Sequence, residues 1–311
     1  MSLILSTAPH IRARQTTRRL MGNVLLSLLP CAAAGVYFFG LRALLVLLVS
    51  TLSAIAAEYL WHVLSHKKAD VTDLSAAVTG LLLGLCVTPA VPLWTVAAGS
   101  VFAIIIVKQL FGGIGDNFLN PALTARAVLL ASWPALMTTH LAPAVFPATD
   151  AVASATPLAT GGYTAMQLLL GQTPGAIGET CKIAVLVGFV FLLLTGTVSW
   201  RIPTVTILSA FVTAWALKMD PLSAVLSGGL LFGAVFMATD YTTSPMHPLP
   251  QTLYAVGIGV MTILIRAFGA YPEGVTYAIL LMNILTPLLD RMMPRRIYGH
   301  GAVQKEGKRH G

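Results

Sequence analysis

Long apolar segments separated by short polar turns make up most of the chain and predict membrane-spanning helices. A helix that crosses the hydrocarbon core of a bilayer needs about 20 apolar residues, and fewer where it is broken or packed inside a bundle. Ten segments meet this description, namely residues 20–40, 41–62, 73–90, 92–110, 121–138, 180–199, 203–218, 221–239, 251–270 and 274–292. Pro203, Pro221 and Pro272 fall at or near expected helix starts, and Asp73 can cap the third segment. The pattern predicts an all-α polytopic membrane protein with about ten transmembrane helices.

Composition supports the membrane assignment and excludes a nucleic-acid-binding protein. Hydrophobic residues make up 56% of the 311 residues and charged residues only 10%, with a mean hydropathy of +0.82. A globular core of this size could not bury so many apolar side chains. The net charge of +8 comes from the two ends, because 4 of the 19 basic residues lie within 12–19 and 6 lie within 291–311. Such clustering is typical of membrane topology signals and not of a nucleic-acid surface.

The distribution of lysine and arginine predicts the orientation. With ten spans and a cytoplasmic N-terminus, fifteen of the 19 basic residues, Arg126 among them, are expected on the inner side. The four expected on the outer side are Arg42, Lys182, Lys218 and Arg266. We therefore expect both termini in the cytoplasm and the loop after the fifth span outside.

Two similar segments suggest an internal repeat. "LSAAVTGLLLGLC" at 74–86 and "LSAVLSGGLLFGA" at 222–234 share leucine, serine, alanine and glycine positions in register. Because five spans separate them, the two segments cross in opposite directions, as in an inverted repeat of two five-helix halves. Small and leucine residues can also match by chance in any two membrane helices.

The predicted organisation has four parts. Residues 1–138 form a cytoplasmic arm and the first five-helix repeat, and 139–179 form an outer loop. Residues 180–292 form the second five-helix repeat, and 293–311 form a basic cytoplasmic tail.

Few residues offer metal binding or acid–base chemistry. No acidic residue falls at the middle of an expected span, so a chain of buried carboxylates typical of a pump is not expected. Glu58, near the inner end of its helix, is expected to be capped or hydrated at the interface. His62 and His66 are spaced for one helix face but lie at the same interface, and the three cysteines lack metal-binding spacing. We expect no metal site, no disulfide and no catalytic residue.

Two expected cytoplasmic turns are unusual. "FGGIGDNFLNPA" at 111–122 joins a glycine-rich backbone to Asn117 and Asn120, which can hydrogen-bond the polar edge of a planar heterocycle. In the alternative, the turn is a tight connection in which Asn120 caps the helix opened by Pro121. "TDYTTSPMHP" at 239–248 lies on the same side in the other half, so the two turns could form one shared mouth.

The loop "TDAVASATPLATGGY" at 149–163 contains Thr156, which looks unremarkable by its own chemistry. It has no neighbouring histidine or lysine to activate it as a nucleophile, and no glycine-rich phosphate cradle precedes a helix.

Four motifs, one of them in this loop, carry a resemblance to a known family. They are "GGIGDNFLNPALTARA", "DAVASATPLA", "FMATDYTTSP" and "YPEGVTYAILLMNILTPLLD". Together they resemble the family formed by the D subunit of the Rnf electron-transport complex and the B subunit of the sodium-pumping NADH:quinone reductase. The similarity covers most of the chain. It implies a ten-helix flavoprotein of the bacterial inner membrane, with a fold similar to that of ammonium and urea transporters.

The resemblance also implies two flavins. In the family a periplasmic flavin transferase joins FMN by a phosphoester bond to a threonine of a motif that commonly reads Ser-Gly-Ala-Thr, and the corresponding residue here is Thr156. This chain has Ala-Ser-Ala-Thr at 153–156, so only the last two positions match the common form. A second, non-covalent riboflavin near the "NFLNPA" stretch implies roles for Asn117 and Asn120.

The implied function is electron transfer through the membrane between partner proteins, in a complex that links ferredoxin and NAD to Na⁺ or H⁺ movement. The implied partners are the A, B, C, E and G subunits of Rnf, together with membrane lipid. Two alternatives remain: a solute channel or carrier of the same fold, flavin transporters included, and a structural anchor for the complex.

Overall fold

The computed structural model describes residues 16–66, 72–143, 157–160, 162–269 and 273–292, and this part of the chain is built from helices. The first half contains α1 (Thr17–Leu64), α2 (Ser75–Cys86), α3 (Leu93–Phe102), the π-helix η1 (Ala103–Gln109), α4 (Pro121–Ser132) and α5 (Pro134–Thr138). The connecting region contains α6 (Pro157–Thr160) and α7 (Ala165–Leu170). The second half contains α8 (Lys182–Leu194), α9 (Arg201–Ala216), α10 (Pro221–Leu226), α11 (Leu230–Phe232), the π-helix η2 (Gly233–Met237), α12 (Pro248–Phe268) and α13 (Val275–Met292). The predicted all-α class is confirmed.

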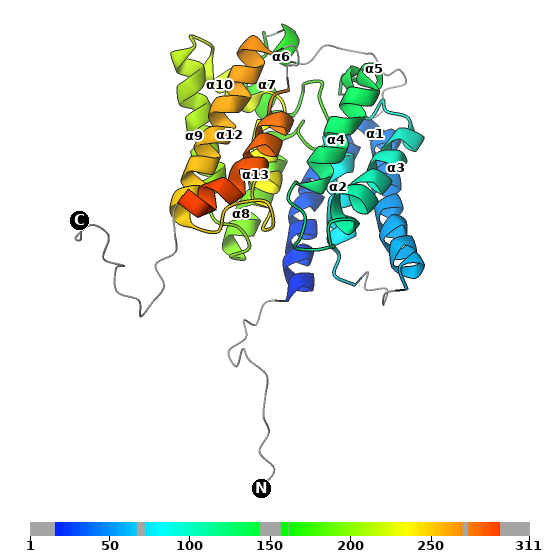
Figure 1. The fold of residues 1–311 in the computed structure, drawn as a ribbon. Helices are drawn as coiled ribbons and strands as arrows, with labels where there is room; N and C mark the ends of the chain where they lie inside the picture. Colours follow the sequence, from blue (N-terminus) through cyan, green and yellow to red (C-terminus); the bar gives the residue numbers. More distant parts are fainter. Residues whose placement is uncertain (1–15, 67–71, 144–156, 161, 270–272, 293–311) are drawn as a thin grey trace, which may run out of the picture.

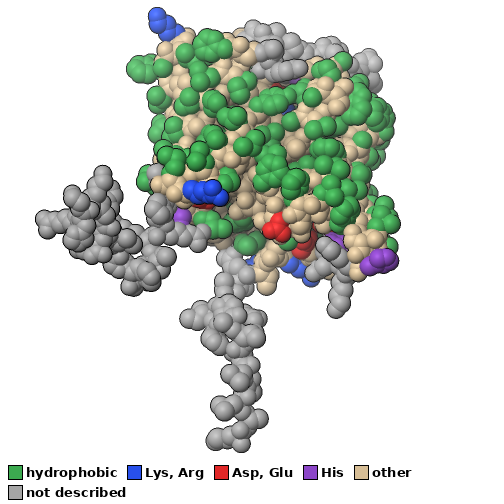
Figure 2. Space-filling model, viewed as in Figure 1, with side chains coloured by type: hydrophobic (Ala, Val, Ile, Leu, Met, Phe, Trp, Pro, Cys, Tyr) green, Lys and Arg blue, Asp and Glu red, His purple; other side chains and the backbone are tan. Residues whose placement is uncertain are grey.

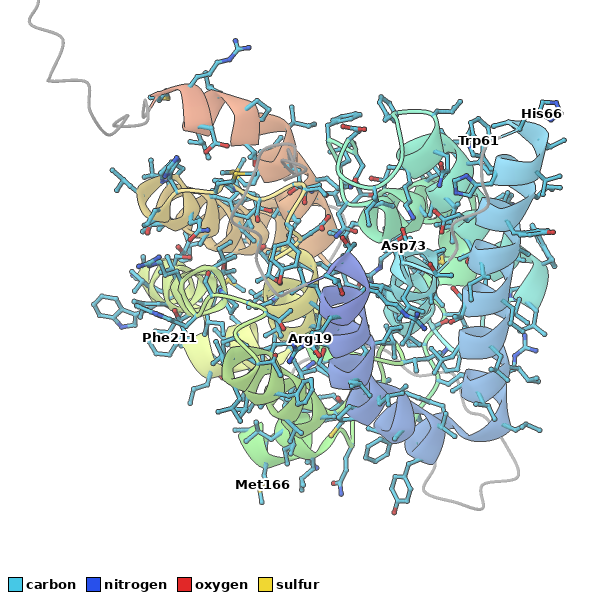
Figure 3. All side chains as sticks on the ribbon, turned by 90° about the horizontal axis from the view of Figure 1, so that it is seen from below. Arg19, Trp61, His66, Asp73, Met166 and Phe211 are labelled. Carbon is cyan, nitrogen blue, oxygen red and sulfur yellow. The ribbon has the colours of Figure 1, made fainter. Side chains whose placement is uncertain are left out.

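Helix α1 is two helices joined at a sharp break. Its 48 residues are interrupted at Gly40, whose φ of 66° and ψ of −155° lie outside the helical region. Glycine adopts this conformation without the steric cost that a Cβ would add. The break falls where the sequence predicts the boundary between its first two segments. Figure 3 shows the result from below, with Arg19 and His66 from the two ends of α1 lying far apart in the view.

Among the residues that the structure describes, three helices, α1, α12 and α13, are long and apolar enough to cross a membrane. The other apolar helices are shorter, because turns and π-helical segments interrupt them. The surface is correspondingly apolar, with Leu41, Leu194 and Trp215 each more than 60% exposed. Figure 2 shows hydrophobic side chains spread over the side of the molecule and charged ones mainly toward its lower end. So much exposed apolar surface is typical of contact with lipid or with other membrane proteins.

The described chain begins and ends on the same side of the bundle. Helix α1 begins and α13 ends toward the lower side in Figure 1, which we call the terminal face, whereas α5 and α6 lie at the upper end, which we call the loop face. The helices of the second half gather on the left of the same view and α2, α3 and α4 on the right. Sites between the halves are therefore built from segments far apart in sequence.

The two similar segments have different backbones. In α2 the helix runs through Gly80, where a Cβ would lie 2.7 Å from the Ser50 carbonyl oxygen and 2.8 Å from the Ala54 Cβ. The glycine thus lets α1 and α2 pack closely. In the second half the helix breaks between α10 and α11, and Gly228 adopts a φ of 63°.

Candidate functional site

A cavity of about 90 Å³ opens at the terminal face between the two halves of the chain. Both unusual turns line it, and the α1, α2 and η2 helices close its apolar sides. Its polar lining comes from Ser75, Thr79, Lys108, Asn117, Asn120, Thr239, Asp240, Tyr241 and Thr242. Its apolar lining includes Met21, Val24, Val78, Leu82, Leu192 and Phe236. The predicted shared mouth of the two turns is therefore confirmed.

Asn120 occupies the N-cap of α4, as the capping alternative predicts. Its Oδ1 accepts a hydrogen bond from the Leu123 N–H at 3.2 Å, and Pro121 follows at the first helical position. Its Nδ2 donates to the Met237 carbonyl oxygen at 3.4 Å, which ties α4 to the end of η2. Both ends of this amide are engaged by the protein, and the residue is 3% exposed.

Asn117 differs because only its donor is engaged. Its Nδ2 donates to the Thr242 hydroxyl at 2.9 Å and to the Leu119 carbonyl at 3.1 Å, so it links the two turns directly. Its Oδ1 accepts no hydrogen bond from any residue that the structure describes, although Asn117 is only 6% exposed. Asn117 lines the cavity, so this oxygen can accept a hydrogen bond from a ligand donor there.

Asp240 contributes the acidic group of the cavity. The Thr242 and Thr243 hydroxyls donate to its Oδ2 at 3.1 and 3.3 Å. Burial raises the pKa of the Asp240 carboxyl above its ordinary range, while these hydrogen bonds act in the opposite direction.

A buried ion pair lies behind the cavity. The Lys108 Nζ is 2.5 Å from the Glu58 Oε1, Gln109 donates to the same oxygen at 2.6 Å, and Lys108 also donates to the Ser75 hydroxyl. Glu58 is 1% exposed, so the expectation of a hydrated carboxylate at the interface is wrong. The reason is that α1, α2 and η1 pack around it, and a buried carboxylate needs a cationic partner. The only signal for this pair in the sequence is weak, a lysine and a glutamine that end an apolar segment.

A second, smaller pocket lies at the loop face. It is lined by residues from α6, α7, α8, α10 and their connections, among them Pro157, Thr173, Glu179, Lys182, Gly228 and Glu273. Lys182 donates to the carbonyls of Glu179 and Gly228. Burial opposes ionisation of Glu179, but the adjacent Lys182 and Arg126 cations hold the pKa of its carboxyl below the ordinary value.

Arg126 is connected to the loop-face pocket through Glu273, which lines it. It is 6% exposed, forms an ion pair with Glu273 and donates to the Thr276 hydroxyl at 3.3 Å. The charge count groups Arg126 with the basic residues of the inner side, whereas its side chain is buried within the bundle. Its side chain instead reaches a carboxylate contributed by the other half, which a buried guanidinium requires.

Thr156 lies outside the residues that the structure describes. The next residue, Pro157, is buried and lines the loop-face pocket. Nearby, Thr164 caps α7 in a reciprocal arrangement with Gln167. The described residues contain no group of three or more histidine, cysteine, aspartate or glutamate side chains placed to hold a metal.

Comparisons with known proteins agree with one family over nearly the whole chain. A model of the NQR2, RnfD, RnfE family matches residues 4–299. The chain is 45% identical, over 99% of its length and 99% of the relative's, to the D subunit of the Na⁺-translocating ferredoxin:NAD⁺ oxidoreductase complex of Acetobacterium woodii. It is 40% identical, over 92% and 93% of the two chains, to the D subunit of the proton-translocating ferredoxin:NAD⁺ oxidoreductase complex of Clostridium ljungdahlii. It is 36% identical, over 94% and 95%, to the D subunit of the ion-translocating oxidoreductase complex of Stutzerimonas stutzeri.

Proposed function

The chain belongs to the NQR2, RnfD, RnfE family, and we propose that it is the D subunit of an ion-translocating ferredoxin:NAD⁺ oxidoreductase complex that carries electrons across the membrane on two flavins. One flavin is a covalent FMN on Thr156, and the other is a non-covalent riboflavin in the terminal-face cavity. Its proposed partners are the A, B, C, E and G subunits of Rnf.

The unpaired oxygen of Asn117 is the observation that most favours a flavin in the cavity. A flavin ring presents an edge of alternating carbonyl and N–H groups, and Oδ1 of Asn117 is an acceptor without a partner in the described structure, inside a cavity of mixed polarity. When bound, the ring supplies the electron chemistry, because it takes up one or two electrons. Asn117 would bind the ring, Asn120 would hold α4 and η2 in place, and the apolar side chains would exclude water.

The proposal for Thr156 rests on the family resemblance and on the place of its neighbours. A phosphoester at this residue would lie next to Pro157, which lines the pocket that also contains Lys182. A lysine ammonium is a suitable neighbour for the negative charge of a phosphodiester. A flavin transferase on the outer side of the membrane would install this group, which requires the loop face to be outside.

In the proposed topology the chain crosses the bacterial inner membrane ten times, its two five-helix halves are inverted relative to each other, and both termini are cytoplasmic. Helical residues occur in all ten predicted segments, and the described chain starts and ends at the same face. A chain that crosses the membrane an even number of times has both ends on the same side.

Flavin analysis of the purified complex tests the proposed function. Acid extraction should release riboflavin, whereas FMN should stay with the denatured chain and fluoresce in a gel. A purified chain without either flavin would refute the proposal and favour a solute carrier of the same fold.

A further inference from the structure

We propose that Lys108, backed by Glu58, sets the reduction potential of the flavin in the terminal-face cavity. This inference rests on the proposed function, because it concerns the non-covalent flavin assigned to that cavity. In this inference the charges of Lys108 and Glu58 tune the flavin. The fold does not need such a role, and neither does flavin binding by Asn117.

The geometry presents one end of the ion pair to the cavity. Lys108 and Ser75 line the cavity, whereas Glu58 lies behind them and contributes nothing to its lining. The Glu58 Oε1 and the Ser75 hydroxyl hold the Lys108 ammonium from the side of the helices. The pair is neutral as a whole, but its positive end is the one nearer a bound ring.

Lys108 is the only lysine or arginine among the residues that line the cavity in the described structure. Asp240 is the other ionisable group of the lining at neutral pH, and it approaches from the turn after η2. Tyr241, from the same turn, is uncharged at that pH. Lys108 is therefore the cationic side chain of the described lining, and Asp240 is its acidic one.

Stability alone gives little reason to bury this pair. Removing two charges from water costs several kcal/mol per ion, and well-packed apolar residues usually serve a core as well or better. The cost is not fully offset here, because the Glu58 Oε2 is buried and has no hydrogen-bond partner in the described structure. Lys108 also lies in the π-helix η1, a deviation that frequently occurs at functional sites.

A fixed cation beside a flavin favours its reduced form. Each electron that enters the ring adds one negative charge, which remains there unless a proton follows it. An ammonium in a site of low dielectric constant stabilises that charge more strongly than it would in water. Charge near the ring nitrogens is one of the means by which proteins tune flavins. The two partners of the pair should therefore act with opposite signs.

The test is a potentiometric titration of the purified complex, with dithionite as reductant and flavin absorbance as readout. The reduction step that belongs to riboflavin is identified with Asn117→Leu, in which this step should be lost together with the extractable riboflavin. Lys108→Met should lower the potential of this step, and Glu58→Gln should raise it because the lysine charge is no longer compensated. A tenfold change in the preference for the two-electron-reduced flavin corresponds to about 30 mV, and we expect at least that change in each direction.

Three further variants keep the test informative. Lys108→Met leaves a buried carboxylate unpaired and could prevent folding, so the double change Lys108→Met with Glu58→Gln removes both charges and should still lower the potential. Lys108→Arg should restore a potential close to wild type. Lys218→Met removes a lysine outside the cavity lining and should change nothing.

The outcomes separate this inference from the function on which it rests. A wild-type complex without extractable riboflavin would remove the proposed ligand itself. A complex that contains riboflavin, but whose riboflavin potential is the same in wild type, the double variant and Glu58→Gln, would overturn the role of Lys108 alone. The potential of the covalent FMN, assigned to the loop face, should stay constant throughout.

Discussion

At the scale of single residues, the two asparagines of the terminal-face cavity have different tasks. Asn120 uses its oxygen to cap α4 and its nitrogen to hold the end of η2. Asn117 joins the two turns through Thr242, and its oxygen has no partner among the described residues. The sequence predicts that both amides matter, and it also predicts the cap. It could not show which amide retains an unused oxygen, because that depends on contacts across the two halves.

The division of tasks predicts different phenotypes. Asn117→Leu should lower riboflavin per covalent FMN in the protein that folds, since it leaves ring atoms unpaired at about 1–3 kcal/mol. That corresponds to a loss of affinity of roughly five- to hundredfold. The melting temperature should fall as well, because the bonds to Thr242 and Leu119 are lost. Extracted riboflavin, quantified by chromatography and normalised to FMN, provides the measurement. Unchanged riboflavin in Asn117→Leu would withdraw the residue from the site.

Asn120 should affect folding alone. Asn120→Ala removes a helix cap, which should cost about 0.5–2 kcal/mol of stability, and the protein that remains folded should keep its riboflavin. Asn120→Ser, which can still cap the helix, is the matched control and should recover most of the stability. The measurement is thermal unfolding in detergent. A large loss of riboflavin in Asn120→Ser with normal stability would show that the Asn120 amide itself binds the ring.

At the scale of helices, the boundaries follow local sequence signals more closely than the interruptions do. The break in α1 falls at Gly40, and α4 and α10 begin at Pro121 and Pro221, as the sequence predicts. Helix α12 begins at Pro248, before the predicted start of its segment at residue 251. The apolar pattern did not predict the π-helices η1 and η2 or the break at Gly228. The break could not be predicted from the glycine itself, because Gly80 at the matching position stays helical. Packing decides between these outcomes, as the contact of Gly80 with α1 illustrates.

The close approach of α1 and α2 can be tested at Gly80. In Gly80→Ala the new methyl group would meet the Ser50 carbonyl oxygen, the Thr51 Cα and the Ala54 Cβ within 2.8 Å, so the helices must separate. Overpacking of this kind costs about 1–3 kcal/mol. Gly22→Ala is the control, because the nearest described atom to its methyl group would be 3.9 Å away and alanine favours a helix. Thermal unfolding of both variants gives the answer, and equal stability would contradict the packing argument.

At the scale of the whole molecule, the distribution of lysine and arginine along the chain predicts the orientation in the membrane. Basic residues that are buried in the bundle weaken this signal. The sequence pattern places Arg126 and Lys108 among the inner-side residues, yet both are buried in ion pairs that only the folded bundle forms. Long-range pairing of this kind leaves no local signature in the sequence. The basic residues at the two ends of the chain carry the orientation signal instead.

Cysteine labelling tests this orientation. A cysteine introduced by Asp150→Cys or Thr160→Cys should react with an impermeant thiol reagent in intact cells, whereas one introduced by Lys67→Cys or His300→Cys should react only after lysis. Native Cys31 and Cys86 are buried, so Cys181→Ser gives a suitable background. Labelling of position 300 in sealed cells would overturn the topology of ten spans with cytoplasmic termini.

The mass of the intact purified chain tests most directly the central claim that this protein carries electrons on a flavin attached at Thr156. The expected mass is that of the polypeptide plus one FMN less one water, and Thr156→Val should return it to the mass of the polypeptide alone. A wild-type chain with the unmodified mass, or a flavin that stays attached in Thr156→Val, would contradict the claim.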